Sequence, residues 1–329
     1  MSALPQYGRH LHPTATMRAV LVDRYGPPEV LRPAVVPRPV PTRGQVLVRT
    51  RFIGVNPKDV IVRKGKFQVV TGKRFPLLVG HDIAGEVVEA GPGADLPVGA
   101  PVFGMINDFA GRAYAEYAAV DAQSLATAPA SVDLRTAAAV PLAAQTALQG
   151  LRDEGRVAPG HHVLVNGASG GVGVFAVQIA KLLGAEVTAA CSARNAELVR
   201  SLGADHVVDY ATTPLPSLPT RFDCVFDVFG NHRFDTLRPL LTPGGTYVQT
   251  IPSGRIVRDI ARTVLSAQRA RLVVVRSHRA QLEWLRAHID DGTLRVVVDR
   301  SFALDDAAEA HRYLETKRAR GKVVLHVDG

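Results

Sequence analysis

The chain has 329 residues, of which 47% are hydrophobic and 21% charged, and its formal net charge is +9. This length allows about two domains, and the hydrophobic fraction excludes a mainly disordered chain. Two cysteines are too few for a disulfide framework or for a four-thiolate zinc site. No apolar run approaches the roughly 18 residues that a membrane-spanning helix needs.

The positive charge first suggests a nucleic acid or an anionic membrane as partner. The basic residues are scattered, however, and the sequence carries no zinc finger, aromatic RNA motif or basic helix with heptads. We therefore expect no specific nucleic-acid partner and no membrane partner, and we attribute most of the charge to surface composition. Residues 1–16 lack the features of a signal peptide, so we interpret them as a flexible N-terminal extension of a cytoplasmic protein.

The pattern of the chain changes twice. In residues 17–138, short strand-like runs are separated by Gly and Pro, which predicts an antiparallel, barrel-like β domain. Residues 139–292 alternate strand-like runs with helix-length stretches, which predicts a doubly wound parallel sheet of the Rossmann type and an α/β fold class. Residues 293–329 return to strand, helix and strand. The parallel strands are expected at residues 162–166, 186–190, 206–209, 224–228, 246–249 and 272–275.

A glycine-rich turn is the most informative motif. It follows the first parallel strand and reads Ala168-Ser169-Gly170-Gly171-Val172-Gly173. The glycines allow a tight turn, and the next helix presents free N–H groups and its positive dipole end to a pyrophosphate. Because further strand and helix units follow, we interpret the turn as a dinucleotide-binding site, against the alternative of a glycine-rich turn without a ligand.

The end of the second parallel strand indicates which dinucleotide binds. An NAD site would carry Asp or Glu about 20 residues after the turn, to bind the ribose 2′-hydroxyl. Here the strand ends in Ser192-Ala-Arg194, with no acid. Ser192 can donate to a 2′-phosphate and Arg194 can pair with it, which predicts NADP(H). The alternative is that Arg194 is a solvated residue at the start of the next helix.

At this point the sequence resembles the medium-chain dehydrogenase/reductase superfamily, in its zinc-free NADPH quinone oxidoreductase branch. The resemblance runs from Met17 to the C-terminus, and an Ala at the first position of the turn is usual in this branch. It is carried by motifs in family order, which are residues 17–31, Gly54-Val-Asn-Pro-Lys-Asp59, Gly80-His-Asp-Ile-Ala-Gly-Glu-Val87, 141–147, 168–173, Asp209-Tyr210, Asp227-Val-Phe-Gly230 and Gly321-Lys-Val-Val-Leu325.

The resemblance implies a GroES-like substrate domain, residues 17–138 closed by 293–329, and a Rossmann NADP-binding domain, residues 139–292. It also implies hydride transfer from NADPH to a quinone or to the activated C=C bond of an enone. Family members commonly form homodimers through an edge strand, for which residues 272–275 are the candidate. Two alternatives stay open. One is a dedicated enone or enoyl reductase in a biosynthetic pathway, and the other is an NADPH-binding crystallin-like or RNA-binding protein with little catalysis.

The residues argue against zinc. Zinc alcohol dehydrogenases of this superfamily carry a Cys where Asn56 stands, together with a His and a second Cys. Only His81 remains here, which leaves fewer than the three protein ligands that a catalytic zinc needs. Cys191 and Cys224 fall inside predicted strands and are interpreted as small core residues. We therefore predict no metal, and we expect His81 to be a hydrogen-bonded structural residue.

Three residues are candidates for the catalytic site. Asn56 is the first choice for a polar group near the nicotinamide ribose and the substrate carbonyl, or it favours the turn before the next proline. Thr146, at the predicted start of a helix, contacts the nicotinamide by resemblance, or it is a capping residue. Asp59 is a candidate that either acts in catalysis or orients its loop.

The remaining cofactor candidates follow later strands. By resemblance, Tyr210 flanks the adenosine phosphate. Two pairs of residues end strands at the carboxyl edge of the sheet, where ligands bind, and they are expected to line the nicotinamide side: Phe229 with Gly230, and Ile251 with Pro252. Lys322 is expected either to reach the cofactor or to be a surface charge.

One position departs from the family pattern. Many enone and enoyl reductases of the superfamily carry a Tyr where this chain has Phe67. If the protein saturates a C=C bond, the α-carbon proton is therefore expected from water or another group. A quinone needs less help, because its reduced form takes up protons readily from solvent. This favours quinones or activated enones over acyl thioesters.

Overall fold

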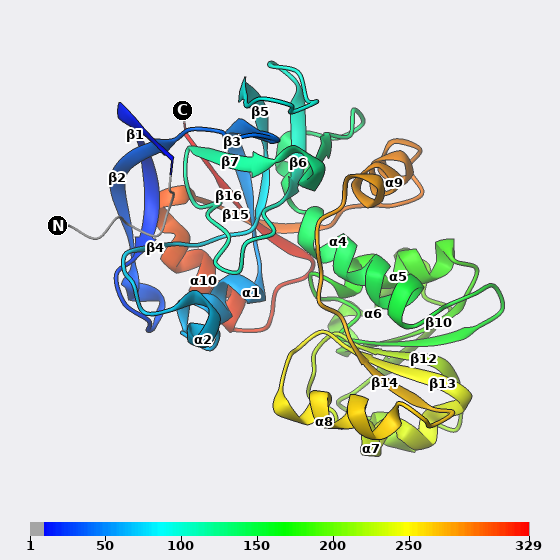
Figure 1. The fold of residues 1–329 in the computed structure, drawn as a ribbon. Helices are drawn as coiled ribbons and strands as arrows, with labels where there is room; N and C mark the ends of the chain where they lie inside the picture. Colours follow the sequence, from blue (N-terminus) through cyan, green and yellow to red (C-terminus); the bar gives the residue numbers. More distant parts are fainter. Residues whose placement is uncertain (1–9, 329) are drawn as a thin grey trace. The chain divides into compact units, whose positions relative to one another are not determined.

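The computed structural model describes residues 10–328 and divides into two compact units (Figure 1). The first unit contains the chain up to Leu142 and from Arg276 onward, and the second runs from Ala143 to Val275. The sequence had suggested boundaries after residues 138 and 292. Helix α9, Arg279–Asp290, therefore belongs to the first unit, where its carboxylate Asp290 accepts a hydrogen bond from the N–H of Ser131 at 3.0 Å.

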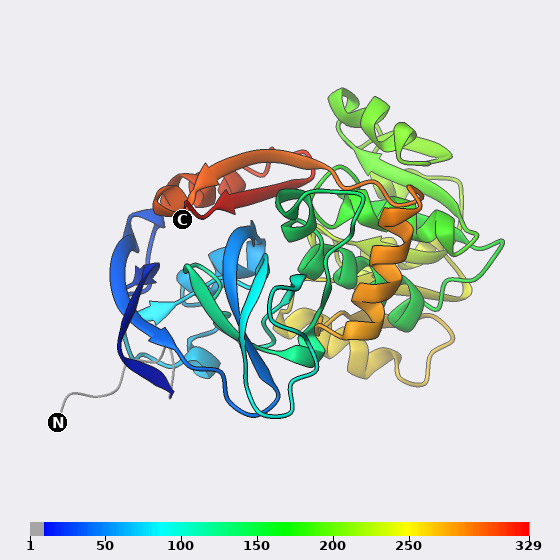
Figure 2. The same ribbon diagram turned by 90° about the horizontal axis from the view of Figure 1, so that it is seen from above.

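The first unit is built on two sheets. The larger has seven strands, in the order β15-β16-β3-β5-β6-β8 with β7 paired to β3, and the smaller has the order β2-β1-β4. The C-terminal strand β16, Lys322–His326, lies between β15 and β3, so the last segment completes this sheet. Figure 2 shows β15 and β16 running side by side. The other strands are β1 Leu11–Val22, β2 Leu31–Pro39, β3 Gln45–Val55, β4 Leu77–Leu78, β5 Asp82–Ala90, β6 Pro101–Met105, β7 Tyr117–Asp121, β8 Leu125–Thr127 and β15 Val298–Ala303.

The helices of the first unit are short. Besides α9 they are α1 Pro57–Arg63, α2 Gln68–Thr71, α3 Leu134–Ala138 and α10 Ala307–Glu315. The core of the unit is made of apolar side chains of the strands, such as Val46, Val48 and Ile53 of β3, all fully buried. Leu47 is fully buried as well, so β3 is covered on both faces in this stretch.

The prediction of a flexible extension was wrong for its last residues. Strand β1 begins at Leu11 and pairs antiparallel with β2, with Leu11 opposite Pro39 and Thr16 opposite Pro37. Most side chains between these two positions are partly or fully exposed. The apolar periodicity that reveals a strand is therefore missing there, and the register of the pairing shifts between Leu11 and Thr16. Residues 1–9 lie outside the described part of the chain.

The second unit is a parallel sheet of six strands in the order β11-β10-β9-β12-β13-β14. Numbered along this unit, the order is 3-2-1-4-5-6, which is that of a dinucleotide-binding Rossmann sheet. The strands are β9 His162–Asn166, β10 Glu186–Cys191, β11 His206–Asp209, β12 Phe222–Asp227, β13 Leu241–Gln249 and β14 Arg269–Leu272. The predicted fold class is thus confirmed, and the edge strand β14 lies three residues earlier than expected.

Helices connect the parallel strands. Helix α5, Gly173–Leu182, packs on β9 and β10, and its residues up to Ala180 are buried. Cys191 and Cys224 are free, buried side chains of β10 and β12, as predicted. The remaining helices are α4 Pro141–Leu148, in which the two units join, α6 Ala196–Ser201, α7 Phe234–Leu237 and α8 Gly254–Thr263.

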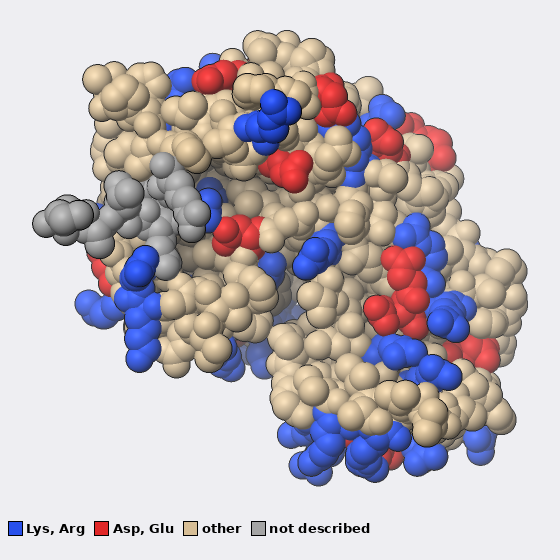
Figure 3. Space-filling view, in the orientation of Figure 1, with Lys and Arg blue, Asp and Glu red and all other residues tan. Residues whose placement is uncertain are grey.

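The positive charge is unevenly placed. Residues 229–275 contain seven Arg and two Asp, with no Lys or Glu. In Figure 3 a dense group of basic side chains lies where α7 and α8 lie in Figure 1, and elsewhere on this face acidic and basic groups are mixed. Among residues 10–328, no helix is long and apolar enough to cross a membrane.

Candidate functional site

The glycine-rich turn joins β9 to α5 in the second unit. A Cβ atom on Gly173 would lie 2.1 Å from the carbonyl oxygen of Gly167, so no other residue fits there without moving the backbone. Gly167 itself has a φ of +84°, a conformation that glycine adopts without strain. The two glycines thus allow the helix to start close to the end of the strand, as the fingerprint requires.

The turn also has the donors that an anion needs. The N–H of Gly170 is bonded within the turn, to the oxygen of Gly167 at 3.1 Å, but the N–H groups of Gly171 and Val172 have no partner within residues 10–328. They stand at the N-terminus of α5, where the helix dipole favours negative charge. Ala168 is buried, and its N–H bonds the oxygen of Ala190 at 3.1 Å. The backbone of Ala168 therefore joins the glycine-rich turn to β10.

The residues predicted for the adenosine end gather at the carboxyl edge of the sheet. Strands β10 and β11 pair so that Cys191 lies opposite Asp209. The N–H of Tyr210 bonds the oxygen of Cys191 at 3.3 Å, which brings Tyr210 next to Ser192. Arg194 and Tyr210 are exposed, and Ser192 is half-buried. No carboxylate stands in the segment from 192 to 196, so the structure offers cationic and hydroxyl groups there.

Asn195 is a residue that the sequence reasoning missed. It is buried, its Nδ2 donates to Oγ of Ser169 in the glycine-rich turn at 2.8 Å, and its Oδ1 has no partner within the described residues. A buried polar atom without a partner is rare in proteins, and a bound ligand is one explanation for it. Together with the glycine turn, this atom shows that the second unit fits a dinucleotide.

The candidates for the nicotinamide side meet around a buried carboxylate. Gly230 has a φ of +67°, and a Cβ there would lie 2.7 Å from Cγ1 of Ile251, so the two predicted segments touch. The N–H of Gly230 donates to Oδ1 of Asp227 at 2.9 Å, and the hydroxyl of Tyr247 donates to Oδ2 at 2.7 Å. Asp227 therefore shapes the loop that contains Phe229, and it too was missing from the predicted site.

Phe229 and Pro252 are exposed at these strand ends. Thr146 is 5% exposed and is the sixth residue of α4, so the expectation that it starts a helix, or caps one, was wrong. The apolar run around Thr146 continues a helix that begins earlier, at Pro141.

In the first unit, Asn56, Asp82 and Lys322 form one buried group. Nδ2 of Asn56 donates to Oδ2 of Asp82 at 2.9 Å, and Nζ of Lys322 donates to Oδ1 of Asn56. Nζ of Lys322 also lies 3.5 Å from Oδ2 of Asp82. Lys322 is 3% exposed, so it is not a surface charge. Both ends of the Asn56 carboxamide are thus held by side chains of the same unit.

Burial opposes both charges of this group. It raises the pKa of Asp82, against the attraction of Lys322, and it lowers the pKa of Lys322, against the attraction of Asp82. The other carboxylate oxygen of Asp82 accepts from the N–H of Leu142 at 2.8 Å. Asn56, the first catalytic candidate, is therefore a residue whose orientation is fixed by a buried acid and a buried amine.

Asp59 is the centre of a second buried network. It accepts hydrogen bonds from the N–H of Asn56 at 2.8 Å and from the hydroxyl of Tyr114 at 3.4 Å, and its Oδ1 lies 2.5 Å from Nδ1 of His81. Burial would raise the pKa of Asp59, but the hydrogen bond and charge of His81 outweigh it, so this pKa lies below its usual value. Asp59 thus orients the loop after β3, one of the two roles expected for it.

Tyr114 extends this network to His311 on α10, whose Nε2 lies 2.9 Å from the tyrosine hydroxyl. Burial lowers the pKa of His311 to about 4 and raises that of Tyr114. Both side chains are therefore neutral at neutral pH. They were missing from the predicted site, because His311 is 230 residues from His81 and nothing in the sequence links them.

His81 has partners on both ring nitrogens. Besides Asp59, it has the oxygen of Phe109 at 3.2 Å from Nε2. His81 is therefore a hydrogen-bonded residue of the buried network, as the sequence predicted. Within the part of the chain that the structure describes, no three His, Cys, Asp or Glu side chains are grouped as a metal site would require.

Two aromatic side chains lie beside this network. Phe67 packs edge-on against Phe109, with ring centroids 6.0 Å apart. Phe109 is 48% exposed, and its backbone oxygen is the one that meets His81. The ring at the position of the family's Tyr thus neighbours the segment from 107 to 112.

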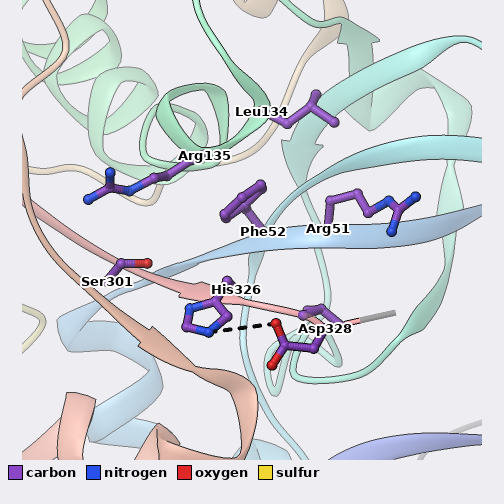
Figure 4. Close-up of a pocket in the computed structure, with 8 residues that line it drawn as sticks. Arg51, Phe52, Leu134, Arg135, Ser301, His326 and Asp328 are labelled. Carbon is purple, nitrogen blue, oxygen red and sulfur yellow. Dashed lines mark ion pairs between the residues drawn. The ribbon is translucent and has the colours of Figure 1, made fainter.

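An open pocket of the first unit lies elsewhere (Figure 4). In Figure 4 the guanidinium groups of Arg51 and Arg135 point away from each other, and an ion pair joins His326 to Asp328. None of the lining residues is a predicted site residue. They are Arg51, Phe52, Leu134, Arg135, Ser301, His326, Val327 and Asp328.

Comparison with known proteins gives two family matches. Residues 42–130 match an alcohol dehydrogenase GroES-like domain, and residues 202–325 match a family described as zinc-binding dehydrogenase. The first corresponds to the strands around β3, β5 and β6. The second covers the later Rossmann strands and the C-terminal segment.

Three similar proteins cover nearly the whole chain. A chloroplastic quinone oxidoreductase of Triphysaria versicolor is 32% identical, with 94% of this chain and 98% of that protein covered. A chloroplastic NADPH-dependent alkenal/one oxidoreductase of Arabidopsis thaliana is 35% identical, with 94% and 79% covered. The solved structure of a quinone oxidoreductase from Coxiella burnetii has a TM-score of 0.87 and 29% identity, with 95% and 100% covered.

Proposed function

The chain belongs to the medium-chain dehydrogenase/reductase superfamily, and on that premise we propose that it is an NADPH-dependent reductase of quinones or enones that works without a metal. The observation that carries the proposal is the nucleotide site, where Arg194 and Ser192 follow β10 and no carboxylate takes their place. Such a site suits a 2′-phosphate and disfavours NADH. The named activities of the relatives support the acceptor class.

The second unit holds the cofactor through its backbone and a few side chains. The N–H groups of Gly171 and Val172 bind the pyrophosphate at the start of α5, and Arg194 pairs with the 2′-phosphate. The loop shaped by Asp227 presents Phe229 to the nicotinamide side. When bound, NADPH supplies the hydride, which is chemistry that belongs to the cofactor.

The first unit contributes order and polarity. Asn56 is held by Asp82 and Lys322, and its backbone is held by Asp59, so the loop before α1 keeps one shape without a ligand. Both Nδ2 hydrogens of Asn56 are engaged, by Asp82 and by the oxygen of Gly54, so Asn56 orders this loop and keeps no amide donor for a substrate carbonyl. A quinone takes its protons from solvent after reduction, whereas an enone needs a proton at its α-carbon that Phe67 has no hydroxyl to supply.

Metal-free chemistry is part of the proposal. The only predicted ligand position that is kept, His81, has both ring nitrogens engaged by Asp59 and by the oxygen of Phe109. A catalytic zinc needs three protein ligands with free lone pairs. The matched family is described as zinc-binding, but this sequence lacks the cysteine ligands that bind zinc in the zinc alcohol dehydrogenases.

A homodimer through β14 is the proposed assembly. β14 is the last strand of its sheet, so one side of it has no neighbour within the described residues. Several apolar side chains around this edge are exposed, among them Leu265 at 98% and Val274 at 70%. An unpaired strand edge with exposed apolar residues beside it is a site of chain association, and molar mass from light scattering tests the proposed homodimer. The cytoplasmic location stays a prediction.

The proposed function is tested with protein shown to be free of metal. We expect it to oxidise NADPH with quinones and enones, much less with NADH, and not to oxidise alcohols. A chelator is expected to change none of these rates. Chelator-sensitive alcohol oxidation, or equal rates with NADH and NADPH, would contradict the proposal. Salt-sensitive RNA binding without NADPH oxidation on any acceptor would favour the non-catalytic alternative.

A further inference from the structure

Asn195 connects the two segments that would surround the adenosine end of a dinucleotide. It ends the short helical turn Ala193–Asn195 that follows β10, and its N–H bonds the oxygen of Ser192 at 2.9 Å. Its side chain reaches back to the glycine-rich turn, where Nδ2 meets Oγ of Ser169 at 2.8 Å. Asn195 is 5% exposed, whereas the neighbouring Arg194 is exposed.

One polar atom of this carboxamide is left over. Oδ1 of Asn195 is buried and has no partner within residues 10–328. The serine hydroxyl can either donate or accept, so the amide satisfies Ser169 in either orientation and keeps its second polar atom free. A free oxygen accepts from a ribose hydroxyl, and a free NH₂ donates to a phosphate. A ribose that carries a 2′-phosphate offers both kinds of group.

We propose that Asn195 is a specificity-determining residue that contacts the adenosine ribose and admits its 2′-phosphate because the side chain is neutral. A carboxylate of the same shape at this position would accept from ribose hydroxyls but repel the phosphate, as the acidic residue of NAD sites does. The inference rests on the proposed NADPH dependence. It adds Asn195 to Arg194 as a residue that makes the site prefer NADPH.

The charges around Asn195 agree with this role. Ser192 and Arg194 follow β10, and Tyr210 follows β11, with its N–H bonded to the oxygen of Cys191. The nearest acids along these segments are Asp209, which accepts from the N–H of Ala211 at 3.0 Å, and the exposed Glu197 of α6. Neither belongs to the segment from 192 to 196. A carboxylate in place of the Asn195 carboxamide would therefore be the first negative charge in this segment.

The test uses ligands that differ only in the phosphate. The full chain and its variants are titrated with 2′,5′-ADP and with 5′-AMP by calorimetry, and folding is followed by circular dichroism and thermal unfolding. Asn195→Asp is expected to raise the dissociation constant of 2′,5′-ADP at least tenfold and to change that of 5′-AMP less than threefold. The matched control, Thr220→Asp, adds the same charge at an exposed position before β12 and is expected to change neither.

A second variant tests the contact without adding charge. Asn195→Ala removes the free atom and the bond to Ser169, and it is expected to weaken both ligands by a similar factor of about three to ten. If Asn195→Ala binds both ligands as the wild type does, the proposed contact is overturned. This variant still gives a decisive result if Asn195→Asp does not fold. Equal effects of Asn195→Asp on the two ligands would overturn the role in specificity.

The wild-type protein separates this inference from the proposed function. If the wild type binds 2′,5′-ADP and 5′-AMP equally, the NADPH dependence itself fails. If it prefers 2′,5′-ADP and Asn195→Asp keeps that preference, the NADPH dependence stands and only the role of Asn195 fails.

Discussion

Lys322 donates a hydrogen bond to the side-chain oxygen of Asn56, although 266 residues separate them in the chain. Strand β16 makes this contact possible, because it pairs with β3 just before Asn56, with Val323 opposite Val55. The C-terminal segment therefore completes the site of the first unit as well as its sheet. A buried amine at this place keeps the Asn56 carboxamide in one orientation and balances the buried Asp82.

Removing the amine should destabilise the protein. Lys322→Met leaves Asp82 buried without its cation, and breaking a buried pair in this way costs about 3–5 kcal/mol. Adding Asp82→Asn to this variant removes the uncompensated buried charge. The double variant should therefore lose at least about 1 kcal/mol less unfolding free energy than the two single variants lose in sum. Denaturant unfolding of the two single variants and the double variant measures this coupling. Strict additivity would mean that Lys322 and Asp82 do not interact.

The buried His311 predicts a loss of stability in acid. Its pKa is about 4 in the folded protein because of burial, whereas it is about 6.5 in an unfolded chain. The unfolded state therefore binds more protons between these values, and stability falls as the pH drops from about 6.5 towards 4. At pH 4.5 this loss amounts to roughly 2–3 kcal/mol.

The measurement compares wild type with His311→Gln, which has no titrating ring. The free energy of unfolding of the wild type should fall more than that of the variant between pH 7 and pH 4.5, and the difference isolates this histidine. Parallel curves for the two proteins would show that His311 is protonated equally in the folded and unfolded states.

Arg194 should be responsible for much of the preference for NADPH. Arg194→Gln removes a charged hydrogen-bond donor, and bonds to charged groups contribute about 1.5–3 kcal/mol, so NADPH should bind about tenfold more weakly or worse. NADH binding should not change. Arg200, exposed on α6, provides the control variant Arg200→Gln, which should bind both cofactors normally. An equal loss for NADH would assign Arg194 a general role instead.

Adding a hydroxyl at position 67 should raise the rate of enone reduction and leave the rate of quinone reduction unchanged. A positioned general acid contributes roughly 10²–10⁴-fold to a proton transfer, so Phe67→Tyr should raise kcat for an enone at least severalfold. The rate with a quinone should stay within twofold. Phe75→Tyr, which adds a hydroxyl to a ring that packs on Tyr25, serves as the control. A rise with both substrates would point to altered binding rather than proton donation.

The sequence predicted the Rossmann sheet well because its strands are buried on both faces. Such strands appear as continuous apolar runs, and β9, with four of its five residues buried, was predicted with the bounds that it has. The strand β1 was predicted six residues short, since its first residues are exposed. The edge strand β14 was displaced because its own residues, Arg269–Leu272, include two arginines, whereas the apolar run that suggested a strand lies mostly after it.

The site was predicted in part. The glycine turn and the residues after β10 were found because their spacing within one segment carries the signal. The partners of Asn56 and Asp59 come from distant segments, and no local pattern reveals that Lys322 or His311 is buried beside them. Asn195 was missed for a similar reason. Its proposed role depends on a contact with Ser169, 26 residues earlier in the chain, which no local pattern reveals.

The central claim is that hydride passes from NADPH to an acceptor carbon without a metal. The most direct measurement uses an enone and NADPH that carries deuterium at the transferring position of nicotinamide C4, with protein whose metal content has been measured as zero. We expect deuterium at the β-carbon of the product, at a rate that added zinc does not increase. Product without deuterium, or activity that appears only after zinc is added, would contradict the claim.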